Sequence, residues 1–155
     1  MNINPSNPPF TFMVRVEIDK PVMAPLYRST ARALDKNLVV LAGDTHNAWA
    51  SDLTDFAGNR VGVEFATSSV TSPGFEEYFP AENPLAVAAG LTQIIGPLQY
   101  ADTARRGFML VTVTAQACRA EWRYVSTVKS RSYTVATGPA LRMLPGAANR
   151  KLVPG

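Results

Sequence analysis

A short polar stretch, Gly43-Asp44-Thr45-His46-Asn47, carries the residue types best suited to chemistry in this sequence. Carboxylate, imidazole and amide groups all bind metals, so Asp44, His46 and Asn47 together could hold a cation. In an extended backbone the side chains of Asp44 and His46 would point the same way, and a turn after Gly43 would bring Asn47 round to them. A hard oxygen donor beside an imidazole suits a divalent or trivalent ion that acts on phosphate oxygens.

The same residues also have simpler interpretations. A Gly-Asp pair after a strand is often only a turn, in which the aspartate accepts hydrogen bonds from the backbone. His46 is the only histidine of the chain, and a lone histidine is commonly a surface or capping residue. If it is functional, His46 could ligate an ion, hydrogen-bond a phosphate or protonate a leaving group. The spacing of the residues does not choose among these roles.

The segment before this stretch must position it, and it has the pattern of a buried strand. Residues 37–42 (Asn-Leu-Val-Val-Leu-Ala) contain a short continuous apolar run, which indicates a strand buried on both faces. Such a strand would place Asp44, His46 and Asn47 at its carboxyl end. In sheets with helices on their faces, ligands bind at that edge.

Other segments predict a mixed sheet with two helices and a C-terminal β-hairpin, which is an α+β fold. The expected helices cover residues 25–36 and 83–95, each with a proline in its first turn. The expected further strands are residues 10–18, 60–67, 107–115 and 119–129, and the last two should pair as a hairpin. Residues 1–155 are predicted to be a single unit in which residues 1–9 and 138–155 are flexible.

Composition excludes several kinds of site. The single cysteine, Cys118, excludes an internal disulfide framework and a multi-cysteine zinc site. One histidine excludes a site with two imidazoles from this chain. No apolar run reaches the roughly 18 residues that span a bilayer, so no membrane span is expected. The first residues have no signal-peptide pattern.

The net charge of +3 hides an uneven distribution. Residues 1–104 carry six basic and eleven acidic side chains, whereas residues 105–155 carry nine basic side chains and only Glu121 as an acid. The basic residues alternate with Val, Thr, Tyr and Trp in strand-like segments, which is more typical of a solvated sheet face than of a nucleic-acid-binding run. Nucleic-acid binding is therefore disfavoured.

Four blocks follow one another in an order that is specific to a known family. They are residues 38–53, which include the Gly-Asp-Thr-His-Asn stretch, residues 61–65 with 69–74, residues 99–102 with 106–108, and residues 120–123. In this order they resemble the alkaline phosphatase D (PhoD-like) family of metallophosphatases. The resemblance covers residues 36–130 and corresponds to the C-terminal portion of such an enzyme.

The resemblance implies part of a metallophosphatase-type αββα sandwich. Members hydrolyse phosphomonoesters and phosphodiesters with a multinuclear site that contains iron and calcium. It implies that Asp44 is a metal ligand, and that His46 and Asn47 lie near the metals or the scissile phosphate, with His46 as a candidate catalytic residue. The family is commonly exported to the periplasm or the cell exterior, but the sequence itself assigns no compartment.

The chain also departs from the family pattern. An aspartate-rich block and a Gly-Asn-type block, which supply the other metal ligands, are not found in it, and residues 19–25 replace a Trp-Asp-Gly-Tyr-like sequence. A site with two or more metals needs about six protein ligands. The sequence therefore predicts a C-terminal fragment that is inactive alone and that lacks the N-terminal half of the domain, including strand partners for residues 38–42.

Two further expectations follow from this interpretation. A sheet without its covering layer would expose an apolar face, so self-association is expected. The alternative to a phosphoester hydrolase fragment is a non-catalytic β-rich interaction module, or a degenerate fragment without a metal site.

Overall fold

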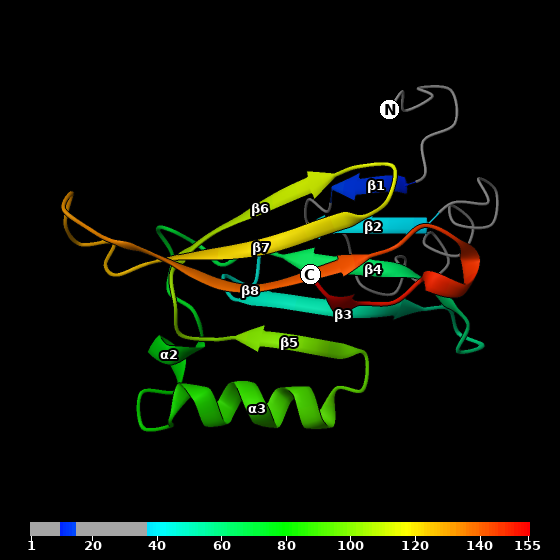
Figure 1. Ribbon diagram of the computed structural model, residues 1–155. Helices are drawn as coiled ribbons and strands as arrows, with labels where there is room; N and C mark the ends of the chain where they lie inside the picture. Colours follow the sequence, from blue (N-terminus) through cyan, green and yellow to red (C-terminus); the bar gives the residue numbers. More distant parts are fainter. Residues whose placement is uncertain (1–9, 15–36) are drawn as a thin grey trace.

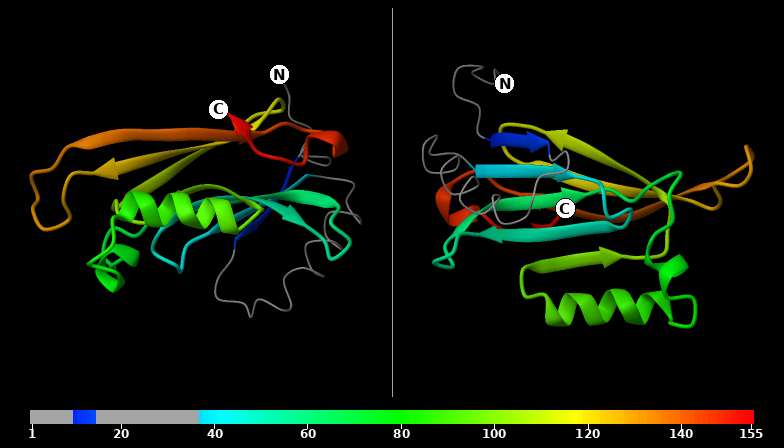
Figure 2. Two further views of the ribbon diagram at one scale, coloured as in Figure 1. Left: turned by 90° about the horizontal axis from the view of Figure 1, so that it is seen from below. Right: turned by 180° about the vertical axis from the view of Figure 1, so that it is seen from behind.

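Two β-sheets packed face to face carry most of the chain, in a computed structural model that describes residues 10–14 and 37–155 (Figure 1). The elements are β1 (Phe10–Val14), β2 (Asn37–Ala42), β3 (Ala48–Thr54), β4 (Arg60–Ala66), α2 (Phe75–Tyr78), α3 (Pro84–Ile94), β5 (Leu98–Asp102), β6 (Gly107–Val113), β7 (Cys118–Val125), β8 (Val135–Met143), a 3-10 turn (Ala147–Asn149) and β9 (Val153–Pro154). Seen along the sheets, they form two layers, with α3 beside β5 (Figure 2). The mixed sheet, the helices and the C-terminal antiparallel strands confirm the α+β prediction.

The first sheet has five strands in the order β1-β2-β4-β3-β5. Strands β1, β2 and β4 run parallel, and β3 runs antiparallel to β4 and β5. As predicted, β2 is buried on both faces, and Leu38, Val39 and Val40 are each 0% exposed. Its neighbours β1 and β4 both belong to this chain. The expectation that the strand partners of residues 38–42 are encoded elsewhere was therefore wrong.

The second sheet is antiparallel, with the strand order β6-β7-β8-β9. Strands β6 and β7 form the predicted hairpin. Residues 138–155, which the composition indicated to be flexible, instead complete this sheet. They contain most of β8 and all of β9, and the Leu152 N–H donates to the Asp52 carboxylate of the first sheet at 2.7 Å.

The glycine and proline of β8 lie at a bulge, which explains why the composition wrongly indicated a flexible segment there. The register with β7 shifts between Glu121 and Arg123, so Gly138 and Pro139 together oppose the single residue Trp122. A bulge is one of the few places in a sheet that tolerate proline, because the extra residue forms no ladder hydrogen bond. A Cβ atom at Gly138 would lie 2.6 Å from the Tyr124 ring, so this position favours glycine.

The core lies between the two sheets and is centred on Trp122 of β7. This side chain is 0% exposed. Its ring centroid is 6.2 Å from that of Phe65 and 4.8 Å from that of Tyr100, both from the first sheet. Its indole N–H donates to the Ala66 carbonyl at 2.9 Å, so Trp122 also connects the two sheets by a hydrogen bond.

Helix α3 begins where the sequence predicts. The Asn83 side-chain oxygen accepts from the N–H groups of Leu85 (2.9 Å) and Ala86 (3.3 Å), and Pro84 occupies the first turn. The four-residue helix α2 lies between β4 and α3. Three predictions concern residues outside the described ranges: the helix at residues 25–36, the flexibility of residues 1–9 and the end of the first strand. Within the described ranges, no helix is long and apolar enough to cross a membrane.

Candidate functional site

The Gly43-Asp44-Thr45-His46-Asn47 loop joins β2 to β3, at the carboxyl end of β2 as the sequence predicted. Asp44 (φ 68°) and His46 (φ 61°) both adopt left-handed backbone conformations. Such conformations are uncommon for residues other than glycine and cost on the order of 1 kcal/mol each. Outliers of this kind cluster at functional sites, so the loop geometry agrees with the residue types in pointing to a site.

The His46 ring is held by a backbone carbonyl from a distant loop. Its Nδ1 atom lies 3.0 Å from the carbonyl oxygen of Pro73. A carbonyl oxygen can only accept, so Nδ1 donates, and in the neutral ring the lone pair lies on Nε2. Metal-binding histidines are commonly oriented in this way, by a hydrogen bond from the ring nitrogen that does not bind the metal.

The Asp44 side chain is exposed to solvent. Among the residues that the structure describes, none forms a hydrogen bond or an ion pair with its carboxylate. This carboxylate is therefore available to a ligand that approaches from solvent.

Asn47, in contrast, is 0% exposed and is engaged by the backbone on both sides of its amide. Its Nδ2 atom donates to the Thr45 carbonyl at 2.6 Å, and its Oδ1 atom accepts from the Phe75 N–H at 3.1 Å. The first bond lies within the loop, and the second attaches the end of the loop to the start of α2. Two positions further on, Trp49 donates its indole N–H to the Thr45 hydroxyl and packs edge-to-face on Phe75, with the ring centroids 5.9 Å apart.

Arg106 holds the backbone of the loop by hydrogen bonds, although the sequence patterns indicated no role for it. Its Nη1 atom donates to the carbonyl oxygens of His46 (2.8 Å) and Ser72 (3.2 Å), and its Nη2 atom forms an ion pair with Glu76 at 2.6 Å. The Arg106 side chain is only 11% exposed. Sixty residues separate it from His46, so no local pattern could have revealed the contact. The signal in the sequence was its place in one of the four family blocks.

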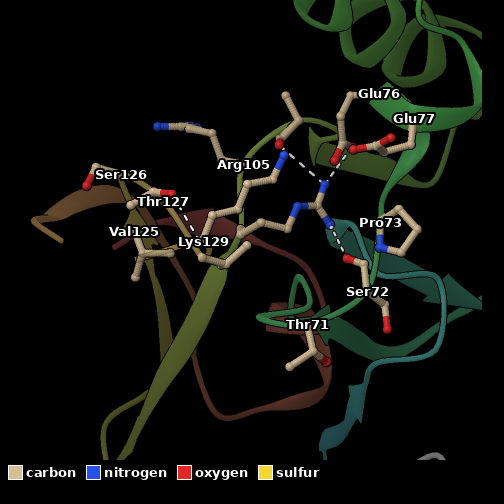
Figure 3. A pocket seen from close by; sticks show the side chains of 13 residues that line it. Thr71, Ser72, Pro73, Glu76, Glu77, Arg105, Val125, Ser126, Thr127 and Lys129 are labelled. Atoms are coloured by element: carbon tan, nitrogen blue, oxygen red, sulfur yellow. Dashed lines mark hydrogen bonds and ion pairs between the residues drawn. The ribbon is translucent and has the colours of Figure 1, made fainter. Parts of the chain in front are cut away.

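A cavity of about 570 Å³, lined by charged, hydroxyl and apolar side chains, opens beside Arg106 (Figure 3). Ser72, Pro73 and Glu76 line one side, residues 126–129 line the other, and Arg105 also contributes to the lining. Pro73 belongs to both features, because its carbonyl holds His46 while the residue also lines the cavity. The cavity therefore adjoins the candidate loop.

The described residues fit one side of a metal site and not a complete one. Across residues 10–14 and 37–155, no three His, Cys, Asp or Glu side chains gather into a group that could hold a metal ion. The loop offers the Asp44 carboxylate and Nε2 of His46, fewer donors than the four or more that an ion in a protein usually takes. Cys118 is no candidate, because it is 0% exposed in the core and burial raises the pKa of its thiol to about 11.

Comparison with known proteins identifies the family. The family model described as PhoD-like phosphatase matches residues 23–122, which include the whole loop, Pro73 and Arg106. This chain belongs to the PhoD-like phosphatase family. The resemblance seen in the four sequence blocks is thereby confirmed.

A solved structure entitled "Structure of PhoD" is similar to this PhoD-like chain. The TM-score is 0.64, the sequence identity is 22%, and the match covers 84% of this chain and 24% of that chain. The likeness shows the fold, a partial metallophosphatase-like sandwich. A search of curated proteins found no match. The PhoD-like chain thus spans about a quarter of the PhoD chain that it resembles.

Proposed function

We propose that this chain supplies one side of the metal site of a PhoD-like phosphoester hydrolase and has little or no turnover by itself. The observation that carries the proposal is the loop after β2. There, the carboxylate of Asp44 is exposed to solvent. Two residues further on, Nδ1 of His46 is hydrogen-bonded to the Pro73 carbonyl, which leaves Nε2 as the ring nitrogen that can bind a metal ion. Membership of the PhoD-like phosphatase family supports the same chemistry.

Asp44 and Nε2 of His46 would hold the ion, and the family resemblance suggests calcium and iron as the metals. A bound ion would polarise the phosphoryl oxygens of a phosphoester and lower the pKa of a bound water. The remaining ligands would come from the N-terminal half of the domain, which this proposal places outside the chain. The 24% coverage of the PhoD chain supports this division.

The other residues of the loop would position His46. Pro73 orients the ring through Nδ1, and Arg106 holds the His46 carbonyl, so that ring and backbone are both fixed. Asn47 would act in the same way, because it is buried and both its amide nitrogen and its amide oxygen are bonded to the backbone of this chain. Prior positioning of this kind lets a side chain bind a metal without reordering the loop.

Metal binding can be tested without any activity assay, because His46 is the only histidine and its ring gives a single set of NMR signals. Calorimetric titration with Ca²⁺ should show weak binding that Asp44→Asn abolishes. Titration with Mn²⁺ should broaden the His46 ring signals in the native chain. Glu82→Gln, which removes an exposed carboxylate just before α3, serves as the control and should leave both results unchanged. Absence of binding would instead favour a metal-free interaction module.

Activity is the second test. The purified chain, supplied with iron and calcium, should hydrolyse an aryl phosphate little or not at all. Clear hydrolysis that drops sharply in Asp44→Ala would contradict the proposal that the site needs ligands from elsewhere.

A further inference from the structure

Strand β6 forms one edge of the second sheet, and this edge lacks the features that normally keep edge strands from pairing. Proteins protect such edges with charges, proline, bulges or very short strands. The β6 sequence, Gly-Phe-Met-Leu-Val-Thr-Val, contains no charged residue and no proline. Its register with β7 is continuous over all seven residues.

Two other edges of the described sheets are protected. Strand β9 is only two residues long and ends in Pro154. Strand β5 has a register irregularity against β3, and α3 packs beside it. β6 is therefore unlike β5 and β9, which raises the question of what pairs with it.

The direction of the free backbone groups on β6 follows from its neighbours. The Val125 N–H donates to the Arg106 carbonyl, and the Thr114 N–H donates to the Ala117 carbonyl, so the even-numbered residues direct their backbone groups toward β7. The odd-numbered residues then face the free edge. The Gly107 N–H agrees with this, because it points away from β7 and donates to the Ser69 carbonyl at 3.2 Å. Within the described part of the chain, no strand pairs with the outward groups of Met109 and Val111.

We propose that β6 pairs antiparallel with β6 of a second copy of this chain, across a two-fold axis at Leu110. In this register Met109 faces Val111 of the second copy and exchanges both backbone hydrogen bonds with it. The symmetry repeats that pair and gives four new hydrogen bonds. Leu110 faces Leu110 of the second copy in a non-hydrogen-bonded pair, the arrangement in which side chains lie closest.

The side chains and charges of β6 are compatible with its own copy. Phe108 and Leu110, which are 41% and 47% exposed, would be partly covered on pairing. The cations Arg105 and Arg106 precede the strand, and the antiparallel arrangement sets them opposite the uncharged end of the other copy, at residues 114–115. Like charges therefore do not meet, and the edge is self-complementary as a two-fold interface requires. The inference is independent of the metal site.

A cysteine at position 110 gives a direct test. In a non-hydrogen-bonded antiparallel pair the Cα atoms are about 4.5 Å apart, within the range that a disulfide bridges. Oxidised Leu110→Cys should therefore form a covalent dimer on a non-reducing gel. Thr112→Cys is the matched control, since the two copies of residue 112 would lie about 14 Å apart along the strands and should not link. Cys118 is fully buried and leaves the background clear.

Solution mass gives a second, independent test. The native chain should run at about twice its mass of 16.7 kDa in light scattering after gel filtration. Leu110→Lys places two positive charges across the axis and should raise the dimer dissociation constant about tenfold or more. Val135→Lys, at an equally exposed position on β8, should not change it. Circular dichroism confirms that each variant is folded.

Three results would overturn the proposal. The first is a native chain that stays monomeric at every concentration, which would instead fit a β6 edge that accepts a strand from the part of the PhoD-like fold outside this chain. The second is equal dimerisation of the two lysine variants. The third is a Thr112→Cys link as efficient as that of Leu110→Cys.

Discussion

Replacing Arg106 with alanine should lower the free energy of unfolding by about 2–3 kcal/mol and make the position of His46 less well defined. A hydrogen bond to a charged group contributes about 1.5–3 kcal/mol, and breaking a fully buried ion pair costs about 3–5 kcal/mol. The first of these two ranges applies to Arg106→Ala. The Glu76 partner is 27% exposed, so water can solvate it again, and the Ser72 contact is long at 3.2 Å. The His46 carbonyl would also keep its bond from the Ser69 N–H.

The assay is urea or thermal unfolding followed by circular dichroism. For a chain of this length, 2–3 kcal/mol corresponds to a fall in Tm of roughly 4–12 °C. Arg106→Lys should lie between the native chain and the alanine variant, because lysine keeps the charge but cannot reach two carbonyls and a carboxylate with a rigid fork. Arg131→Ala removes an exposed arginine and is the control. The ring signals of His46 should shift or broaden in Arg106→Ala alone.

Two outcomes would refute this reasoning. One is an Arg106→Ala variant whose stability lies within about 0.5 kcal/mol of that of Arg131→Ala, the range of ordinary surface substitutions. The other is a destabilised variant with unchanged His46 signals, which would mean that Arg106 supports the fold without positioning the histidine. A double-mutant cycle with Glu76→Gln separates the ion pair from the carbonyl contacts and should give a coupling of about 1 kcal/mol.

Three further predictions concern single positions. Asp44→Gly should raise the free energy of unfolding by up to about 1 kcal/mol, because glycine adopts φ 68° without strain, and should abolish Ca²⁺ binding in calorimetry; a loss of stability would contradict the backbone argument. The Cys118 thiol should resist Ellman's reagent at mildly alkaline pH and react in concentrated guanidinium chloride, since burial raises its pKa to about 11; rapid reaction of the native chain would show that the core opens. The hydrogen bond from Arg119 and the charge of Arg123 lower the pKa of Glu121, so its stabilisation is present at neutral pH and is lost as the pH falls from about 4.5 through the lower folded value. The free energy of unfolding of Glu121→Gln should therefore fall less at acid pH than that of the native chain. Equal pH dependence of the two would exclude this contribution of Glu121.

Local signals in the sequence located the elements that have strong patterns. The apolar run of β2, the Asn83-Pro84 start of α3 and the β6–β7 hairpin were all predicted correctly. Strand β3 was missed because its sequence, Ala-Trp-Ala-Ser-Asp-Leu-Thr, contains few of the residues that favour strands. It is a strand because its small residues fit between β4 and β5 under the aromatic core.

The candidate site was predictable only where it is continuous in the chain. Residue types and the end of β2 were sufficient to single out Asp44 and His46. The supports were not predictable, because Pro73 and Arg106 reach His46 through the tertiary fold, and a backbone carbonyl leaves no trace in residue type. The left-handed conformations of Asp44 and His46 have only a weak sequence signal, since neither position is a glycine, although aspartate and histidine adopt this conformation more often than most other residues.

The two tryptophans lie in different parts of the molecule, which suits measurement by fluorescence. Trp49 donates a hydrogen bond to the Thr45 hydroxyl in the candidate loop, whereas Trp122 lies at the centre of the core. Intrinsic fluorescence should therefore carry two separate reports, one from each ring. Arrival of a quenching cation would dim Trp49 first, and only denaturation would shift the emission of Trp122 to the red. Trp49→Phe would leave Trp122 as the single tryptophan emitter, so comparing this variant with the native chain would separate ion capture from unfolding without a label.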